Sequence, residues 1–100
     1  MEKWADFIIS RVRYDDDHSR IIECEVFPDF GEGLGAKTHH SRTTIASNLE
    51  NNHYLTVYKN EKGNFIKGDN VIRYLLDGEY FIRTDGNKLK KDNLGKLPEY

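Results

Sequence analysis

The feature that most constrains the fold of this chain is the dipeptide Asp77-Gly78, which separates two apolar runs in VIRYLL-DG-EYFIRT, residues 71–84. Asp-Gly tolerates the positive φ angles that a type I′ turn requires at both of its central positions. The sequence therefore predicts a tight β-hairpin at this point. Its register pairs Leu75 with Tyr80, Tyr74 with Phe81, and Ile72 with Arg83.

Both faces of this hairpin are rich in apolar side chains, and such faces are normally covered rather than left in water. The sheet is therefore expected to curl strongly, to be covered by a helix, or to contact a partner subunit. Tyr74 and Phe81 are the residues expected at that partner surface. One face carries Val71, Leu75, Tyr80 and Ile82, and the other carries Ile72, Tyr74, Leu76 and Phe81.

Three further segments have the alternating pattern of strands, at 7–14 (FIISRVRY), 20–27 (RIIECEVF) and 53–59 (HYLTVYK). In the first, alternation puts Ile8, Ser10, Val12 and Tyr14 on one face and Arg11 and Arg13 on the other. In the second, it puts Ile22, Cys24 and Val26 on one face. The first two strands are expected to form an antiparallel hairpin.

A short helix is predicted within SRTTIASNLENN, residues 41–52. Ser41 is a suitable N-cap, and Asn51 or Asn52 a suitable end. The preceding segment, PDFGEGLGAKTHH, contains Gly31, Gly33 and Gly35, so it is predicted to be a long flexible connection, with 31–37 as its Gly-rich part. The predicted fold is a single α+β domain over residues 1–100, ordered β-β-α-β-β-β, with a small curled antiparallel sheet that is barrel-like if it closes.

Composition restricts the possible partners and the compartment. The formal charge of −2 gives no overall attraction to phosphate backbones or anionic membranes. The only cysteine, Cys24, excludes an internal disulfide framework, which favours a reducing compartment such as the cytoplasm. The start, MEKWADFIIS, has an apolar run of only three residues, so neither a signal peptide nor a membrane span is expected.

Three stretches give the chain a family resemblance: ADFIISRVRYDDDHSRI, YKNEKGNFIKGDNV and DGEYFIRTDGNKLKKDNLGKLPEY. They resemble a family of short bacterial proteins known only as domain of unknown function 3892. The resemblance covers most of the chain and implies a shared fold, but the family has no established activity to carry over. The most specific motif comprises Arg83, Thr84, Asp85, Gly86, Asn87, Asp92, Asn93, Leu94, Gly95, Leu97 and Pro98.

The C-terminal segment after 84 is predicted to be a strap rather than a loose tail. Asp85-Gly86 is a second turn signal that would fold the Lys-rich segment back onto the sheet. Leu94, Leu97 and Tyr100 would then be its anchors, because disordered ends are normally poor in leucine and aromatic residues.

Two surfaces are candidates for binding anions. The first surrounds the helix start, where free N–H groups and the helix dipole favour an anion. Its residues are Lys37, His39, His40, Arg42 and Thr43. The second is a basic and aromatic surface suited to single-stranded nucleic acid. It would use Arg11, Arg13, Arg73 and Arg83, with Lys67, the lysines at 88, 90 and 91, and the rings of Tyr54, Tyr58 and Tyr74.

No metal site is expected from the four histidines, because paired ligands at zinc spacing are missing and the adjacent His39 and His40 would point to opposite sides of a strand. No cofactor is expected either. The leading hypothesis is a non-enzymatic binding or regulatory module that acts through a protein partner or as a homo-oligomer. The alternative is binding of a nucleic acid or a phosphorylated small ligand. An enzyme using His39 or His40 as a base is disfavoured, since no nucleophile or oxyanion donor can be named.

Overall fold

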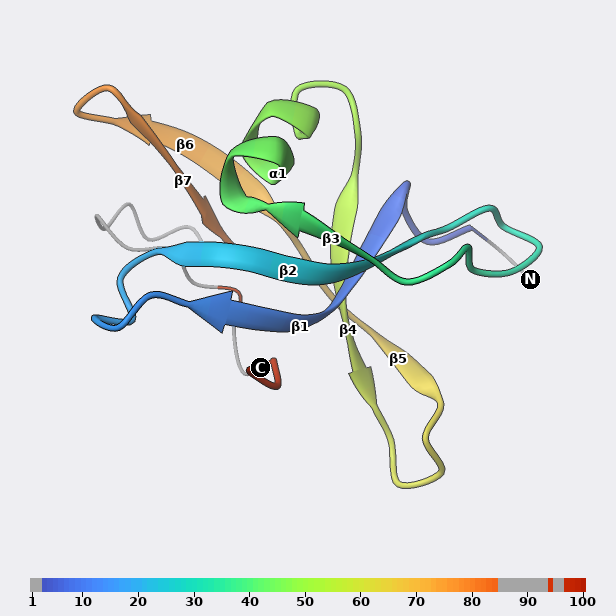
Figure 1. Ribbon diagram of the computed structural model, residues 1–100. Helices are drawn as coiled ribbons and strands as arrows, with labels where there is room; N and C mark the ends of the chain where they lie inside the picture. Colours follow the sequence, from blue (N-terminus) through green and yellow to red (C-terminus); the bar gives the residue numbers. More distant parts are fainter. Residues whose placement is uncertain (1–2, 85–93, 95–96) are drawn as a thin grey trace.

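The computed structural model describes residues 3–84, 94 and 97–100 (Figure 1). Most of this part of the chain is β-structure, and one short helix lies against it, so the α+β class is confirmed. The elements are β1 (Phe7–Tyr14), β2 (Ile21–Pro28), β3 (Thr38–Ser41), α1 (Arg42–Asn48), β4 (Tyr54–Lys59), β5 (Phe65–Asn70), β6 (Ile72–Leu76) and β7 (Glu79–Arg83).

The main sheet has five strands in the order β3-β2-β1-β4-β5, and β6 and β7 form a separate two-stranded sheet. β4 runs parallel to β1, whereas the other neighbours in the main sheet are antiparallel. The chain reaches β4 only after β2, β3 and α1, and a crossover of this length can place two strands side by side in parallel. The predicted antiparallel pairing is therefore confirmed for three of the four pairs in the main sheet, whereas β1 and β4 are parallel. The sheet is open, so the barrel-like closure and the predicted strand order are wrong.

Two strands were missing from the predicted order. β3 forms at the end of the segment predicted to be a flexible connection, and it pairs with β2 so that His40 lies opposite Cys24. β5 pairs with β4, with Val57 opposite Lys67. Both strands are short and polar, so their pairing depends on the strand beside them more than on their own pattern.

The hairpin of β6 and β7 is confirmed. Asp77 and Gly78 have φ angles of 52° and 79°, as a type I′ turn requires, and Tyr74 pairs with Phe81 as expected. In Figure 1 its turn lies at the opposite end of the molecule from the β4–β5 turn. Val71, between β5 and β6, is buried, and its N–H donates to the carbonyl of Tyr54, which ties the hairpin to the main sheet.

The helix begins after Ser41, whose hydroxyl accepts a hydrogen bond from the amide of Thr44 at 3.2 Å, so the predicted N-cap is confirmed. It ends at Asn48, earlier than the predicted Asn51 or Asn52. Seven residues are too few for a helix that is stable alone. Packing of the buried Ile45 and Ala46 against the sheet therefore stabilises it.

Each face of the main sheet carries its own apolar cluster. The cluster on the helix side is the larger, and it includes Ile9, Val12, Cys24, Val26, Ile45, Tyr54, Val71, Ile82, Leu94 and Leu97. The cluster on the opposite face consists of Ala5, Ile8, Leu55 and Val57, with Trp4, Phe27, Leu34 and Phe65 packed against it. Apolar side chains therefore pack on both faces of the main sheet. The face away from the helix carries the site described below.

A register irregularity at Ser10 changes which side chains share a face of β1. The β1–β2 register shifts between Ile9 and Arg11, as in a β-bulge. Ile8 consequently packs in the cluster away from the helix, while Val12 packs in the helix-side cluster. The prediction that these two residues share a face is therefore wrong. On β2, Cys24 and Val26 are buried as expected, but Ile22 is exposed and Ile21 is buried in its place.

The described part of the C-terminal segment is anchored to the domain as predicted. Leu94 and Leu97 are buried in the helix-side cluster. Val12 donates its N–H to the carbonyl of Pro98 at 2.9 Å, and Tyr100 donates its N–H to the carbonyl of Val12 at 3.2 Å. The Asp85-Gly86 turn and Lys88, Lys90 and Lys91 lie outside the described residues.

Candidate functional site

The residues of the predicted anion site at the helix start are not brought together. His40 is half-buried, and its Nδ1 lies 2.8 Å from the hydroxyl of Tyr54. Burial lowers the pKa of His40 below its usual value. His39, on the other side of β3, is exposed with its ring 5.6 Å from that of Tyr100. Arg42 and Thr43 line one cavity and Lys37 lines another. Because Ser41 also caps the seven-residue helix, we assign no anion site there.

The four arginines of the predicted nucleic-acid surface are also separated. Arg13 is exposed, whereas Arg83 is buried. Arg73 donates a hydrogen bond to the carbonyl of Ala46 at 2.8 Å, against the helix. Arg11 alone lines a cavity on the face of the sheet away from the helix. The predicted continuous basic surface is therefore not formed by these side chains.

The predicted partner surface at Tyr74 and Phe81 is internal. Phe81 is fully buried and Tyr74 is half-buried beside it, with the two ring centroids 5.8 Å apart. The exposed apolar side chains of the hairpin are instead Ile72, Leu75 and Tyr80. Leu75 and Tyr80 are 58% and 42% exposed and pair directly across the two strands.

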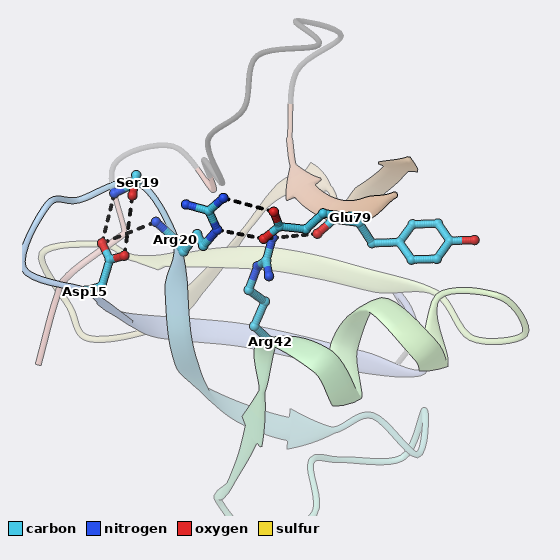
Figure 2. A network of polar contacts seen from close by, with 6 residues as sticks. Asp15, Ser19, Arg20, Arg42 and Glu79 are labelled. Atoms are coloured by element: carbon cyan, nitrogen blue, oxygen red, sulfur yellow. Dashed lines mark hydrogen bonds and ion pairs between the residues drawn. The ribbon is translucent and has the colours of Figure 1, made fainter. Parts of the chain in front are cut away.

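Arg20, Arg42 and Glu79 form a network of charged side chains beside the hairpin (Figure 2). Arg20 donates two hydrogen bonds to the carboxylate of Glu79, at 2.6 and 2.9 Å. Arg42 lies 3.1 Å from the same carboxylate and donates to the carbonyl of Tyr80 at 2.5 Å. Both guanidinium groups lie over the ring of Phe81, at 5.4 and 5.2 Å from its centroid. We call these contacts the Glu79 joint, because they connect the hairpin to the turn before β2 and to α1.

The turn before β2 is also ordered by a carboxylate. Asp15 accepts hydrogen bonds from the backbone amides of Ser19 and Arg20, at 2.9 and 3.3 Å (Figure 2). Asp side chains commonly accept hydrogen bonds from the backbone amides of their own turn in this way. It fixes the backbone from which Arg20 reaches the Glu79 joint.

The cavity beside the Glu79 joint has a volume of about 490 Å³ and a balanced set of charges. Arg42 and Arg73 face Glu50 and Glu79, and both arginines already have partners in the protein. The arginine contacts hold the pKa of Glu79 at about 2, so its carboxylate stays charged under ordinary conditions. This arrangement serves to hold the hairpin in place and leaves no excess charge for a ligand.

A second cavity, of about 510 Å³, opens on the face of the sheet away from the helix, and we call it the Glu25 cavity. Such a volume lies within the range of small-molecule sites. The β-bulge matters here, because it lets the consecutive residues Ser10 and Arg11 both reach Glu25 on β2. The lining residues are Ser10, Arg11, Glu25, Lys37, Val57, Tyr58, Lys59, Phe65 and Pro98.

Glu25 is the buried centre of this cavity, with 6% of its surface exposed. Ser10 donates a hydrogen bond to one carboxylate oxygen at 2.8 Å, and Arg11 Nε donates to the other at 2.8 Å. A second guanidinium nitrogen of Arg11 contacts the same oxygen, and Lys37 Nζ lies 4.0 Å from it. Burial would raise the pKa of Glu25, but the hydrogen bonds from Arg11 and Ser10 outweigh it and hold the pKa below its usual value.

The Glu25 cavity has more positive than negative charge. Three cations, Arg11, Lys37 and Lys59, line it together with one carboxylate. The side chains of Arg11 and Lys37 remain 42% and 52% exposed, so both are accessible to a ligand. Lys59 lies over the ring of Phe65 at 5.7 Å. A cavity of this composition can hold an anion in a chain whose net charge is itself negative.

Sequence reasoning found Arg11 and Lys37 but assigned them to different surfaces, and it missed Glu25, Lys59 and Phe65. The missed residues lie on three strands, β2, β4 and β5, so no local spacing connects them. One signal was present in the sequence: an antiparallel pairing of the first two strands puts basic residues of one close to acidic residues of the other. Arg11 does pair with Glu25, and Arg13 with Glu23.

The described residues, 3–84, 94 and 97–100, contain no group of three or more His, Cys, Asp or Glu side chains placed to hold a metal ion. No helix in this part of the chain is long and apolar enough to cross a membrane. Cys24 is fully buried on β2, where it pairs with His40 of β3 and packs in the helix-side cluster.

The structure thus defines a small α+β domain with a mixed, open sheet and a cationic cavity on one face. Residues 8–98 match the family described as Protein of unknown function (DUF3892), and the chain belongs to that family. No curated protein and no solved structure matches it. The resemblance found in the sequence is therefore confirmed at the level of the family.

Proposed function

We propose that the protein is a non-enzymatic binding module that holds a small anionic ligand in the Glu25 cavity. The observation that carries the proposal is the set of three cations around one buried carboxylate that is already hydrogen-bonded. Phosphate and carboxylate groups are the anions whose geometry suits arginine and lysine donors. The buried Cys24 fits a reducing compartment, and we propose the cytoplasm as the place of action.

In this proposal Glu25 does not contact the ligand but fixes Arg11. Two nitrogens of the guanidinium are held by one carboxylate oxygen, which orients the rest of the group. A guanidinium oriented in advance loses little side-chain entropy when it receives an anion. Lys37 and Lys59, from the loop before β3 and the end of β4, then contribute charge from two other directions.

The test is a titration with inorganic phosphate and with acetate, followed by amide chemical shifts in NMR spectra. We expect the largest shifts at Ser10, Arg11 and Lys37, and weaker binding as salt rises, because exposed charges are screened. Lys37→Gln and Lys59→Gln should each weaken binding severalfold. Lys62→Gln is the matched control, since Lys62 is an exposed lysine in the β4–β5 turn and lies outside the lining of the cavity.

Equal binding by the Lys37 and Lys59 variants and the wild type would overturn this assignment of the site. The nucleic-acid version has less support than a small ligand, since Arg11, Arg13, Arg73 and Arg83 do not share a surface. A labelled oligonucleotide that binds more tightly than phosphate, and in a manner sensitive to Arg13→Gln, would restore it.

A second candidate function is self-association or contact with a protein partner through the β6–β7 hairpin. The observation in its favour is the exposed pair of Leu75 and Tyr80 on one face of the hairpin. Adjacent exposed apolar side chains are a feature of protein interaction sites. Sedimentation of the wild type and of Leu75→Lys tests it, with Ile22→Lys, an exposed isoleucine on β2, as control. An assembly state that neither variant changes would argue against the hairpin.

A further inference from the structure

A third cavity, of about 330 Å³, lies on the same face of the sheet as the Glu25 cavity and is almost entirely apolar. Its walls come from the N-terminal segment, from β1, from the Gly-rich loop and from the start of β5. The lining residues are Trp4, Ile8, Gly33, Leu34, Asn64 and Phe65. We call it the Trp4 cavity.

The two cavities adjoin each other. Phe65 lines both of them. Ile8 lines the Trp4 cavity and Ser10 lines the Glu25 cavity, and these residues are two positions apart on β1, about 7 Å along a strand. Val57, in the wall of the Glu25 cavity, belongs to the same apolar cluster as Ile8. The two cavities therefore lie next to each other, and we refer to the pair as one groove with a cationic end and an apolar end.

The groove does not arise from weak packing of the sheet itself. Ile8 and Val57, which line it, are almost completely buried. The other apolar side chains of the Trp4 cavity, Trp4, Leu34 and Phe65, are half-buried. An apolar space of this size beside a set of accessible cations matches a ligand that has an apolar part and a negatively charged part.

We infer that the natural ligand is a small amphipathic anion. Its carboxylate or phosphate head would lie among Arg11, Lys37 and Lys59, and its apolar tail would fill the Trp4 cavity. This inference rests on the proposed function, because it extends the same site. Charge complementarity fixes the direction of the ligand in the groove, since the charged side chains that line the two cavities, among the residues that the structure describes, are all at the Glu25 end.

The tail should contribute measurably to affinity. Each methylene group moved from water into an apolar site tightens binding by up to about fourfold. A ligand with a tail of several carbons should therefore bind far more tightly than phosphate or acetate, which occupy the cationic end alone. A neutral molecule with the same tail should lack the contribution of the head.

The chain carries its own reporter for this experiment, because Trp4 is its single tryptophan and lines the apolar end. We would titrate the protein with acetate, hexanoate, decanoate and decanol, measuring Trp4 fluorescence and the heat of binding. We expect affinity to rise from acetate to decanoate, a change in Trp4 emission with decanoate but not with acetate or inorganic phosphate, and weaker binding of decanol.

Variants separate the two ends of the groove. Lys37→Gln should weaken every anion by a similar factor. Leu34→Ala should weaken decanoate and leave phosphate unchanged. Its matched control is Ile66→Ala, which removes the same kind of side chain from an exposed position on β5 next to Phe65. These surface or half-buried positions leave the core intact, so the variants remain folded for measurement.

Two results would overturn the inference in distinguishable ways. If phosphate and acetate bind but decanoate binds no tighter, the Trp4 cavity does not hold an apolar tail. The inference then fails, while the proposed binding of a small anion in the Glu25 cavity remains. If no anion binds, or decanol binds as tightly as decanoate, the cations do not recognise a ligand and the proposed function fails together with the inference.

Discussion

Glu25 and Glu79 present a direct comparison, because each carboxylate is held by arginine on a different side of the molecule. Glu79 receives Arg20 and Arg42, and the two guanidinium groups also cover the ring of Phe81. Glu25 receives Arg11 and Ser10, while Lys37 and Lys59 stand around an open cavity. Both carboxylates form ion pairs with arginine. Of the two cavities beside them, the Glu25 cavity is the one with more cations than carboxylates.

This difference shows that an ion pair between a carboxylate and an arginine does not by itself indicate a binding site. The other contacts of the arginine and its exposure to solvent decide whether it can receive a ligand. At the Glu79 joint, Arg42 is also bonded to the backbone and packed on Phe81, so its role is to hold β7 against α1. In the Glu25 cavity, Arg11 is held by Glu25 and lies over the ring of Tyr100 at 5.0 Å, but its side chain remains 42% exposed. The first site closes a joint within the protein, and the second faces outward.

The largest expected effect is on stability at the Glu79 joint. Phe81→Ala should lower the free energy of unfolding by about 3–5 kcal/mol, because it empties a fully buried aromatic position. Urea denaturation measures this, and Phe81→Leu gives a milder variant that stays folded. Phe65→Ala, at the half-buried wall of the cavities, should cost less. Equal losses at the two positions would break the comparison, since Phe65 would then be core as well.

The next effect is at Glu25 itself. Glu25→Ala should lower the free energy of unfolding by about 1–3 kcal/mol, because the buried hydroxyl of Ser10 loses its acceptor. It should also weaken anion binding, since Arg11 loses the contact that orients it. A variant with unchanged stability and tighter anion binding would show that Glu25 opposes the ligand by charge and does not prepare the site.

Glu79 should affect stability less, and in a way that depends on pH. Its pKa is held near 2 in the folded protein, below the ordinary value of 4.5. A carboxylate whose pKa is depressed by folding contributes stability above the unfolded pKa and loses it as pH falls toward the folded pKa. The stability difference between the wild type and Glu79→Gln should therefore be constant above about pH 5 and shrink between pH 4.5 and 2. A difference that persists at pH 2 would contradict the ionic role of Glu79.

The smallest effect on stability is expected for Lys37→Gln. The side chain is half exposed and its nitrogen lies 4.0 Å from Glu25, so its loss should change the free energy of unfolding by no more than about 0.5 kcal/mol. The same variant should lose anion affinity severalfold. A large loss of stability with unchanged affinity would move Lys37 from the ligand site to the structural set that includes Arg42.

Parts of the fold could be predicted because their signals are local. The Asp77-Gly78 turn, the Ser41 cap and the first two strands were all found in this way. The leucines of the C-terminal strap were found because apolar residues in a polar segment need a buried place. The family resemblance extended over nearly the whole chain but carried no function.

The rest could not be predicted because it depends on neighbours distant in sequence. β3 and β5 have weak patterns of their own and form by pairing with β2 and β4. The bulge at Ser10 puts Ile8 and Val12 on opposite faces of β1, and no residue in that segment predicts it. The partner surface at Phe81 was misplaced because the two arginines that cover its ring come from the turn before β2 and from α1.

The sequence by itself determined the class of the domain, the final hairpin, the helix start and the anchors of the strap. Each of these follows from turn geometry, capping or the need to bury apolar side chains within a short stretch. Only the tertiary structure decided which charged side chains are held in contacts within the protein and which remain accessible to a ligand. The reason is that the interaction energy of a charged side chain depends on its burial and on the charged groups around it. Those neighbours come from strands that meet only in the folded chain.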